Sequence, residues 1–221
     1  MEFLVMSCRP WLIIPVKSLT TAKSSFADRF SPDERKMLVI AMLSDVLAAA
    51  SRSKVLRKVC VLSSDREILS LAEEMGTLPL EEPGLGLNPA LEFAADFAMR
   101  AGADSVLIMP SDVPLVTPED IDGIVSMADA ERVVVISPSK DRGTNALLLR
   151  PPDVIHPKFG GESFPAHMQE AMRAGVGLRI YHSENLAHDI DRPADLLKVR
   201  VLAPASRTSE FLSQLEGMLQ K

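Results

Sequence analysis

Short apolar runs alternate with longer amphipathic segments along the chain, and this alternation predicts strands separated by helices. Each apolar run is bounded by turn-forming residues, as is typical of a buried strand. The expected strands are 11–16, 59–62, a run that starts at Val106, 133–136 and 146–149. The expected helices run from Ser31 to about Ala50, from about Asp65 to Met75, from Asn88 to Gly102, and from Thr117 onward.

The alternation of these elements predicts a mixed α/β sandwich in which helices cover a mostly parallel sheet. The first helix has a clear start, because Ser31 is a cap residue, Pro32 suits the first helical position and Glu34 completes a capping box. We expect one domain over 1–203 and a helical tail over 204–221. The apolar face expected for that tail consists of Phe211, Leu212, Leu215 and Leu219.

Composition and charge narrow the class of protein. With 221 residues and 47% apolar content the chain can bury one good core, and its net charge of −6 argues against broad nucleic-acid binding. Cys8 and Cys60 lie too far apart for a metal knuckle and suggest a reducing compartment. Residues 1–6 lack a basic leader region, and the apolar run 11–16 is too short to span a membrane. We therefore expect a soluble, cytoplasmic protein that contacts no membrane.

The strand that starts at Val106 breaks at an Asp-x-Pro sequence, Asp112-Val113-Pro114, before the next helix start. In open α/β sheets ligands bind outside the carboxyl ends of the strands, so Asp112 stands where a metal ion or a phosphate would be bound. The alternative is that Asp112 only caps the turn before Pro114. The segment by itself favours neither interpretation.

The loop after the first strand, 15–25, contains no glycine, so it lacks the G-x-G-x-x-G sequence of a dinucleotide-binding fold. Hydride transfer is therefore a poor hypothesis. The loop instead carries Lys17 and Lys23 with hydroxyl residues between them, a composition suited to a nucleotide triphosphate. The alternative is a pair of solvated surface lysines.

Three further loops place small polar residues at the ends of elements. The 84–89 loop combines glycines with a helix start at Asn88, the 143–145 loop enters a strand, and the 159–164 loop precedes a helix. Backbone N–H groups and hydroxyls at such places can receive a phosphate or a carboxylate. Each loop could equally be an ordinary turn, and Asn88 or Ser163 an ordinary helix cap.

A second acidic segment follows at 188–196. Alternation places Asp189 and Asp191 on the same face of a strand, just ahead of a helix with Pro193 in its first turn, so the two carboxylates could join Asp112 around a cation. Magnesium is the expected ion, since one or two carboxylates together with substrate phosphates commonly hold it. The alternative is that one of the two aspartates caps the helix that begins near Pro193.

Taken together, these motifs resemble a known family. In chain order they are Pro15-Val-Lys, Ala22-Lys, Glu34-Arg, Ser64-Asp, Gly86-Leu-Asn, Asp112-Val-Pro, Gly143-Thr-Asn, Phe159-Gly-x-x-Ser-Phe-x-x-His and Asp189-Ile-Asp-x-Pro-x-Asp-Leu. Over about residues 11–200 the chain resembles the 2-phospho-L-lactate guanylyltransferase family of coenzyme F-420 biosynthesis. The resemblance implies a single-domain, three-layer nucleotidyltransferase sandwich of the nucleotide-diphospho-sugar transferase type, related to the molybdenum-cofactor guanylyltransferases. It also implies synthesis of lactyl-2-diphospho-5′-guanosine and pyrophosphate from GTP and 2-phospho-L-lactate.

The resemblance also implies roles for individual residues. Lys17, Lys23 and Asp112 would act in catalysis, and the relatives usually carry an arginine where this chain has Ser24-Ser25. The nucleotide would be bound by Pro15, Lys17, Lys23, Ser63, Gly86 and Asn88. The acceptor would be bound by Thr144, Gly161, Ser163 and His167. Mg²⁺ would be held by Asp112, Asp191 and Asp189.

The sequence alone leaves other acceptors and other protein classes as alternatives. The expected partners are GTP and a small phosphorylated carboxylic acid, and a homodimer is the assembly considered. Phosphoenolpyruvate and 3-phosphoglycerate are alternative acceptors, because they differ little from 2-phospho-L-lactate. A metal-dependent glycosyltransferase is a rival enzyme class, but its Asp-x-Asp motif would fall where this chain has Ser111-Asp112-Val113. A non-catalytic regulatory protein would need no clustered carboxylates.

Overall fold

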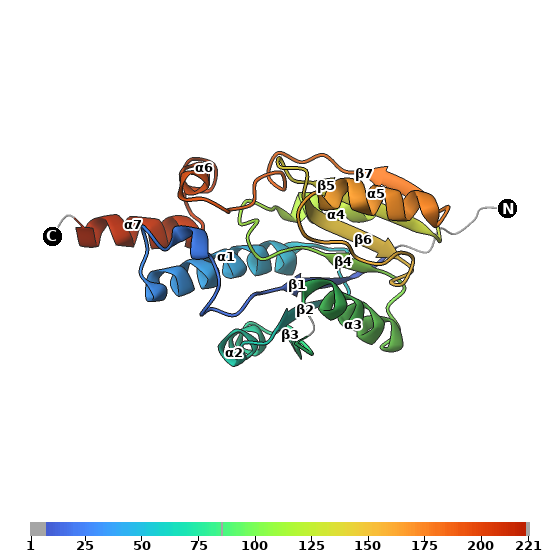
Figure 1. Ribbon diagram of the computed structural model, residues 1–221, viewed down its shortest axis with the longest axis horizontal. Coiled ribbons are helices and arrows are strands. Elements are labelled where there is room, and N and C mark those ends of the chain that lie inside the picture. Colours follow the sequence, from blue (N-terminus) through green and yellow to red (C-terminus); the bar gives the residue numbers. More distant parts are fainter. Residues whose placement is uncertain (1–7, 85, 220–221) are drawn as a thin grey trace.

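The computed structural model describes residues 8–84 and 86–219, which form one mixed sheet with helices on both faces (Figure 1). The strand order is β3-β2-β1-β4-β6-β5-β7, and β6 runs antiparallel to both of its neighbours while the other pairs are parallel. The strands are β1 (Trp11–Pro15), β2 (Lys58–Ser63), β3 (Leu78–Glu81), β4 (Val106–Ile108), β5 (Val133–Pro138), β6 (Thr144–Arg150) and β7 (Gly177–Ile180). The predicted three-layer α/β sandwich is confirmed.

The helices begin largely where local sequence signals place them. Ser31 accepts a hydrogen bond from the N–H of Glu34 and forms the predicted capping box, and Thr117 forms a second one with Asp120. The helices are α1 (Pro32–Arg52), α2 (Arg66–Glu74), α3 (Leu87–Arg100), α4 (Pro118–Ser126), α5 (Ser163–Arg173), α6 (Leu196–Leu202) and α7 (Arg207–Leu219). Short 3₁₀ turns lie at Ser24–Phe26 and Pro193–Asp195.

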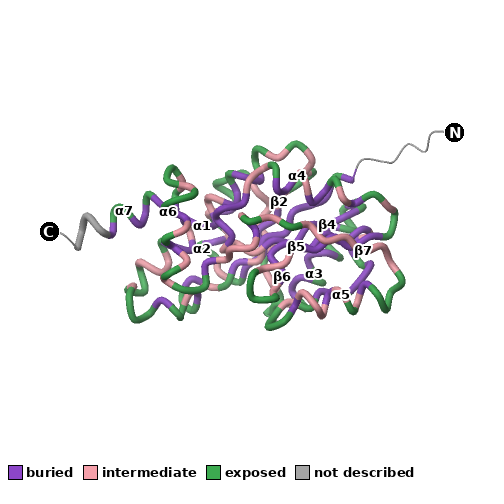
Figure 2. Tube along the Cα trace, turned by 90° about the horizontal axis from the view of Figure 1, so that it is seen from above, coloured by how far each residue is buried: buried purple, intermediate pink, exposed green. Residues whose placement is uncertain are grey.

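The two faces of the sheet build two apolar layers, because successive side chains of a strand point to opposite faces. Leu12 and Ile14 pack with residues of α1 and α4, while Trp11 and Ile13 pack with residues of α3 and α5. Buried segments run through the middle of the molecule and exposed segments surround them (Figure 2).

Three features differ from the sequence-based expectation or were not foreseen. The strands β3 and β7 are the edges of the sheet, and neither is more than partly buried. Proline is tolerated in a strand at an edge, so Pro79 hid β3 from the pattern. Asn88 was expected to cap α3, but the helix begins two residues earlier than that, at Leu87, with Gly86 at its N-cap and a positive φ of 92°.

The expected boundary at 203/204 falls in the turn between α6 and α7. Of the predicted apolar face of α7, Phe211, Leu212 and Leu215 are buried in the same core layer as α1. The side chain of Leu219 and the predicted absence of a leader at residues 1–6 lie outside the described residues. No helix in the part of the chain that the structure describes is long and apolar enough to cross a membrane.

Candidate active site

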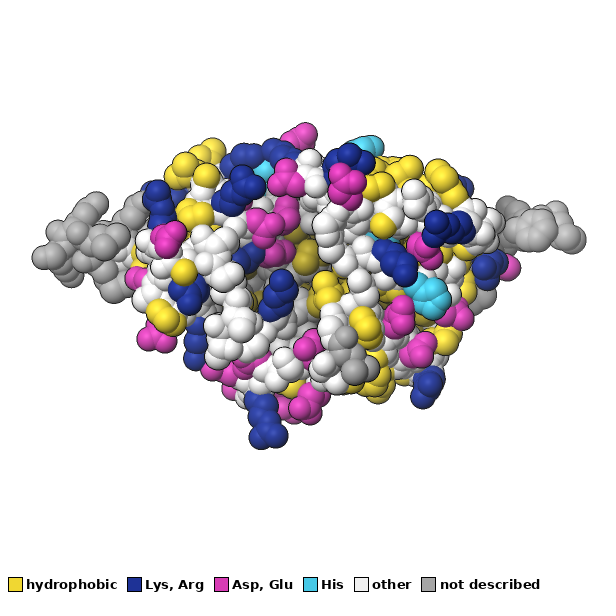
Figure 3. All heavy atoms as spheres, in the orientation of Figure 1, with side chains coloured by type: hydrophobic (Ala, Val, Ile, Leu, Met, Phe, Trp, Pro, Cys, Tyr) yellow, Lys and Arg dark blue, Asp and Glu magenta, His cyan; other side chains and the backbone are white. Residues whose placement is uncertain are grey.

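Polar loops gather along one edge of the sheet. The carboxyl ends of β1, β2 and β4 meet there, and because β6 is antiparallel, its first residue, Thr144, lies at this same edge. In the view of Figure 3 the molecule is hollowed near its centre, and Lys or Arg and Asp or Glu side chains lie around the hollow. The position agrees with the rule that α/β sheets bind ligands beyond the carboxyl ends of their strands.

Lys23 connects the acidic groups at this edge. Its Nζ atom lies 2.7 Å from Oδ2 of Asp112 and 3.4 Å from Oδ1 of Asp191, and it also donates to the carbonyl of Ile190. Lys23 adopts a left-handed backbone conformation, φ 52°, which directs the chain into the 3₁₀ turn that follows. Ser25 of that turn donates to the carbonyl of Asp191 at 2.7 Å.

The charge of Lys23 is secured by its partners. Its side chain is only 11% exposed, and this desolvation is the largest single influence and lowers its pKa. The charge and hydrogen bond of Asp112, together with those of Asp191, outweigh that effect and raise the pKa of Lys23 above its ordinary value. Lys23 is therefore an ammonium ion at neutral pH.

The prediction that Asp189 and Asp191 share the face of a strand is wrong. Residues 188–192 form no strand; the N–H of the buried Ile190 binds the carbonyl of Asp112 at 2.9 Å. Ile190 is therefore apolar because this contact buries it, and the alternation of Asp189, Ile190 and Asp191 does not mark a strand. Asp189 accepts a hydrogen bond from Asn145 at 3.4 Å, and burial, with the charges of Asp112 and Asp191, raises the pKa of its carboxyl group.

The donor set tests whether magnesium would fit here. Within residues 8–84 and 86–219 no three His, Cys, Asp or Glu side chains converge as a metal site, so the predicted three-aspartate set is not assembled. Asp112 and Asp191 nevertheless already share one cationic group, the ammonium of Lys23. Two carboxylates and water or phosphate oxygens are the ligands that Mg²⁺ prefers, so this pair fits the ion.

Asp65 holds the loop that carries the lysines, a role that the sequence did not reveal. It caps α2 and also accepts hydrogen bonds from the N–H of Leu19 at 2.9 Å and the hydroxyl of Ser18 at 3.0 Å. Desolvation is the largest influence on Asp65 and raises its pKa, but these hydrogen bonds outweigh it and lower the pKa below the ordinary value. The predicted nucleotide residue Ser63 is buried and donates to the carbonyl of Val16, whereas Lys17 is exposed.

Three of the four predicted acceptor residues, Thr144, Ser163 and His167, come together at the start of β6. The N–H of Phe164 binds the carbonyl of Arg142 at 3.1 Å, which brings the first turn of α5 against the 142–144 segment. His167 of α5 lies 2.9 Å from the hydroxyl of Thr144 and is fully buried. Its second nitrogen accepts a hydrogen bond from the N–H of Lys158 at 2.8 Å. The imidazole is thus enclosed by protein partners.

The burial of His167 gives a stability prediction. Desolvation lowers its pKa from 6.5 to about 4, so the folded protein excludes a proton that the unfolded chain takes up between those pH values. Above pH 6.5 the imidazole is neutral in both states, and stability is lost as the pH falls toward 4, by about 3 kcal/mol from this residue. Urea unfolding of His167→Gln is expected to lack this part of the pH dependence. The exposed-residue control His182→Gln should retain it; equal slopes for wild type and His167→Gln would contradict the assignment.

The predicted nucleotide residues on α3 are placed differently from one another. Gly86 is exposed at the helix N-cap, where a left-handed φ favours glycine. Asn88 uses both polar atoms of its amide on the backbone of Phe159. The exposed Gly161 lies in the same loop as Phe159. This contact joins the α3 start to the loop before α5.

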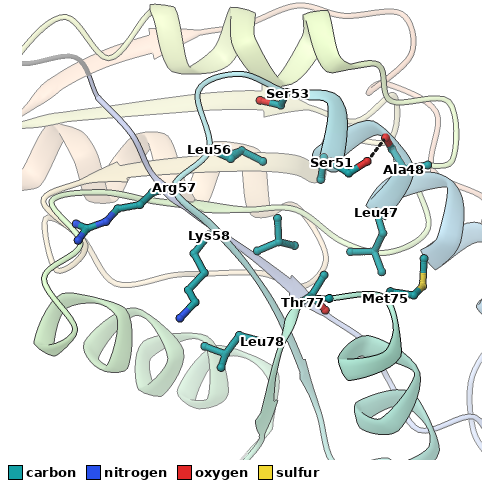
Figure 4. A pocket seen from close by; sticks show the side chains of 13 residues that line it. Leu47, Ala48, Ser51, Ser53, Leu56, Arg57, Lys58, Met75, Thr77 and Leu78 are labelled. Carbon is teal, nitrogen blue, oxygen red and sulfur yellow. Dashed lines mark hydrogen bonds between the residues drawn. The ribbon is translucent and has the colours of Figure 1, made fainter.

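A large cavity lies elsewhere, at the amino ends of β2 and β3 (Figure 4), and its volume is about 730 Å³. The three hydroxyls that line it already donate within the protein: Ser51 to the carbonyl of Ala48, Ser53 to Oδ1 of Asp122 and Thr77 to the carbonyl of Ala72. Arg57 donates to the carbonyl of Gly102. With these polar groups paired and no carboxylate in the lining, this cavity lacks the chemistry of the strand-end site.

Comparison with known proteins agrees with the geometry. The family described as Guanylyl transferase CofC like matches residues 11–220. The chain belongs to this family. The CofC-like assignment confirms the resemblance inferred from the motifs and favours nucleotidyl transfer over the glycosyltransferase alternative.

Two relatives in this family align over nearly the whole chain. A phosphoenolpyruvate guanylyltransferase of Sphaerobacter thermophilus is 42% identical over 199 residues, covering 90% of this chain and 96% of that protein. A 2-phospho-L-lactate guanylyltransferase of Methanothermobacter thermautotrophicus is 37% identical over 204 residues, covering 92% and 89%. The predicted enzyme class, a nucleotidyltransferase, is confirmed.

Solved structures support the fold of this CofC-like protein. A putative nucleotide-diphospho-sugar transferase from Desulfovibrio desulfuricans has a TM-score of 0.77 at 17% identity, covering 96% of this chain and 97% of that one. A CMP:2-keto-3-deoxy-manno-octonic acid synthetase complexed with CTP has a TM-score of 0.62 at 13% identity, covering 89% and 98%. At such identities the likeness bears on the fold alone.

Proposed function

We propose that the protein transfers the guanylyl group of GTP to the phosphate of a small phosphorylated three-carbon acid and releases pyrophosphate. The observation that carries the proposal is the cluster of Lys23, Asp112 and Asp191 at the same sheet edge as Thr144 and Ser163. A cationic and acidic centre thus adjoins a region of small hydroxyl donors. The product would belong to coenzyme F-420 biosynthesis, as the family resemblance implies.

The nucleotide would lie over the parallel half of the sheet. Lys17 and Lys23 follow the carboxyl end of β1 and would neutralise the triphosphate, while Pro15 and Ser63 would shape the floor beneath it. Gly86 would let the base approach the backbone of the α3 start. Fixed cations that face developing charge on the departing pyrophosphate lower the barrier to phosphoryl-type transfer.

Asp112 and Asp191 would hold Mg²⁺ in the working enzyme. When bound, the ion would supply charge neutralisation at the α-phosphate. Lys23 bridges the same two carboxylates in the structure, which supports the proposal that a cation between them relieves their mutual repulsion. Asp189 adds negative charge beside the pair, and its proximity strengthens the demand of the site for a cation.

The acceptor would lie beside the antiparallel strand β6. The hydroxyls of the buried Thr144 and Ser163 and the backbone N–H of the exposed Gly161 would be the donors, and such small donors suit a compact anion. A phosphate monoester has a second pKa of about 6, so at neutral pH it is largely a dianion and attacks phosphorus without a general base. The role of this half of the site is therefore to position the acid.

Phosphoenolpyruvate and 2-phospho-L-lactate are the two acceptor candidates. We expect phosphoenolpyruvate to be the better substrate, because relatives at 42% and 40% identity carry that name, against 37% for a 2-phospho-L-lactate enzyme. The measurement is pyrophosphate release with GTP and each acid, including 3-phosphoglycerate, and with ATP in place of GTP. Release with neither three-carbon candidate, or equal rates with ATP and GTP, would contradict the proposal.

The remaining parts of the proposal are the setting and assembly of the enzyme. A reducing cytoplasm is supported by Cys8 and Cys60, which are both free thiols buried in the core. A homodimer is supported by the apolar side chains that α6 exposes, Leu197 at 63% and Val201 at 77%. Light scattering of the purified protein would measure the assembly directly.

A further inference from the structure

Asn88 forms a two-bond clamp on the loop before α5. Its Nδ2 atom donates to the carbonyl of Phe159 at 2.9 Å, and its Oδ1 atom accepts from the N–H of the same residue at 2.7 Å. The segment 156–160 has no regular secondary structure, so its backbone groups depend on such partners. Two opposed hydrogen bonds to one residue fix both its position and its orientation.

His167 holds the same loop from the other side. Its Nε2 atom accepts from the N–H of Lys158 at 2.8 Å and therefore carries no proton. In the neutral ring the proton is on Nδ1, which donates to the hydroxyl of Thr144 at 2.9 Å. The ring of Phe159 packs edge-on against the imidazole, with centroids 5.0 Å apart. Hydrogen bonds thus hold the loop at two consecutive residues, Lys158 and Phe159.

The tautomer of His167 has a consequence for Thr144. A hydroxyl that accepts a hydrogen bond from Nδ1–H must direct its own proton to a different acceptor. Thr144 begins β6 at the strand-end edge, beside the first turn of α5. His167 therefore presets this hydroxyl as a donor, the polarity that an anionic acceptor needs.

We propose that Asn88 and His167 are positioning residues that fasten the acceptor loop, residues 158–163, to the start of α3 and to Thr144. This inference rests on the proposed function and deepens it, because it joins the nucleotide half-site to the acceptor half-site by a continuous chain of contacts. The chain runs from Asn88 through Phe159 and His167 to Thr144. In this role Asn88 orders the acid-binding loop and does not select the base.

Steady-state kinetics of Asn88→Ala tests the assignment. The KM for the phosphorylated acid is expected to rise about tenfold, because the loop loses two hydrogen bonds, while the KM for GTP and the preference for GTP over ATP stay within about twofold. The matched control is Glu92→Ala, which breaks an exposed contact of 3.0 Å between the same helix and His156. That control should change neither KM. A loss of GTP preference in Asn88→Ala with an unchanged KM for the acid would overturn the proposal.

A second variant and a second readout separate positioning from general destabilisation. His167→Gln should raise the KM for the acid too, and the double variant should cost less than the product of the two single effects, since both act on one loop. Amide hydrogen exchange at Phe159 should accelerate at least about tenfold in Asn88→Ala and stay unchanged in Glu92→Ala. Faster exchange with an unaltered KM for the acid would overturn the positioning role.

Failure of the proposed function is distinguishable from failure of this inference. If the wild-type protein transfers guanylyl groups to none of the acids, the proposed function fails. The exchange rate at Phe159 is measured without any substrate, and an unchanged rate in Asn88→Ala refutes the clamp by itself.

Discussion

Asp112→Asn is expected to lower the turnover number for guanylyl transfer by about 100-fold or more, with the fold intact. The amide oxygen of asparagine can still accept the hydrogen bond that Lys23 Nζ donates at 2.7 Å, so the local structure survives. The variant lacks one of the two negative charges, those of Asp112 and Asp191, that are proposed to hold Mg²⁺. Turnover at saturating GTP and acid, measured over a range of Mg²⁺ concentrations, would show the loss.

The control for this prediction is Asp153→Asn. Asp153 is exposed in the turn after β6, and because β6 is antiparallel to β4, that turn lies at the opposite edge of the sheet. Its turnover should equal that of the wild type. Near-normal turnover in Asp112→Asn, with circular dichroism unchanged, would exclude Asp112 from the reaction.

Lys23→Met is expected to have the second large effect. Removing the ammonium leaves Asp112 and Asp191 without their shared cation, so turnover should fall about 100-fold and the free energy of unfolding by about 1 to 2 kcal/mol. Because the two carboxylates are 25% and 67% exposed, solvent screens part of their repulsion and keeps the stability loss modest.

A second expected result for Lys23→Met is its thermal stability in the presence of Mg²⁺, which is measured without an activity assay. The variant should gain more thermal stability from added Mg²⁺ than the wild type, since no ammonium competes for the same carboxylates. Lys36→Met is the matched control, because Lys36 forms a comparable 2.7 Å ion pair with Glu67 on the surface. That control should show the wild-type response to Mg²⁺. An equal response in Lys23→Met would mean that the ion does not bind at Asp112 and Asp191.

The parts of the fold that the sequence predicted are those with strong local signals. Strand β1 is nearly all apolar, and α1 begins at a capping box that needs only Ser31 and Glu34. The sequence did not predict the edge strands β3 and β7. Each is four residues long and only partly buried, so neither alternation nor a continuous apolar run marks it.

For the site residues too, local motifs predicted some features and only the folded chain shows the others. The motifs placed Lys23 and Asp112 in one site, but only the folded chain shows that they bind each other across 89 positions. The strand predicted around Asp189 and Asp191 failed because Ile190 is buried by long-range contacts that no local pattern encodes. The cap predicted at Asn88 was wrong for a related reason. An asparagine near a helix start usually caps the helix, but the amide of Asn88 binds the backbone of Phe159, 71 positions away.

In the proposed function, the reversed direction of β6 would place GTP and the acid over different parts of the sheet. The order β3-β2-β1-β4 is all parallel and carries the loops proposed for GTP, whereas the segments proposed for the acid flank β6, between β4 and β5. Mutations in 139–145 and 158–163 would therefore change the proposed acid site and leave the proposed nucleotide site unaltered. An engineering or evolutionary change from one phosphorylated acid to another is expected to map to those two segments, with Asn88 and the lysine loop retained.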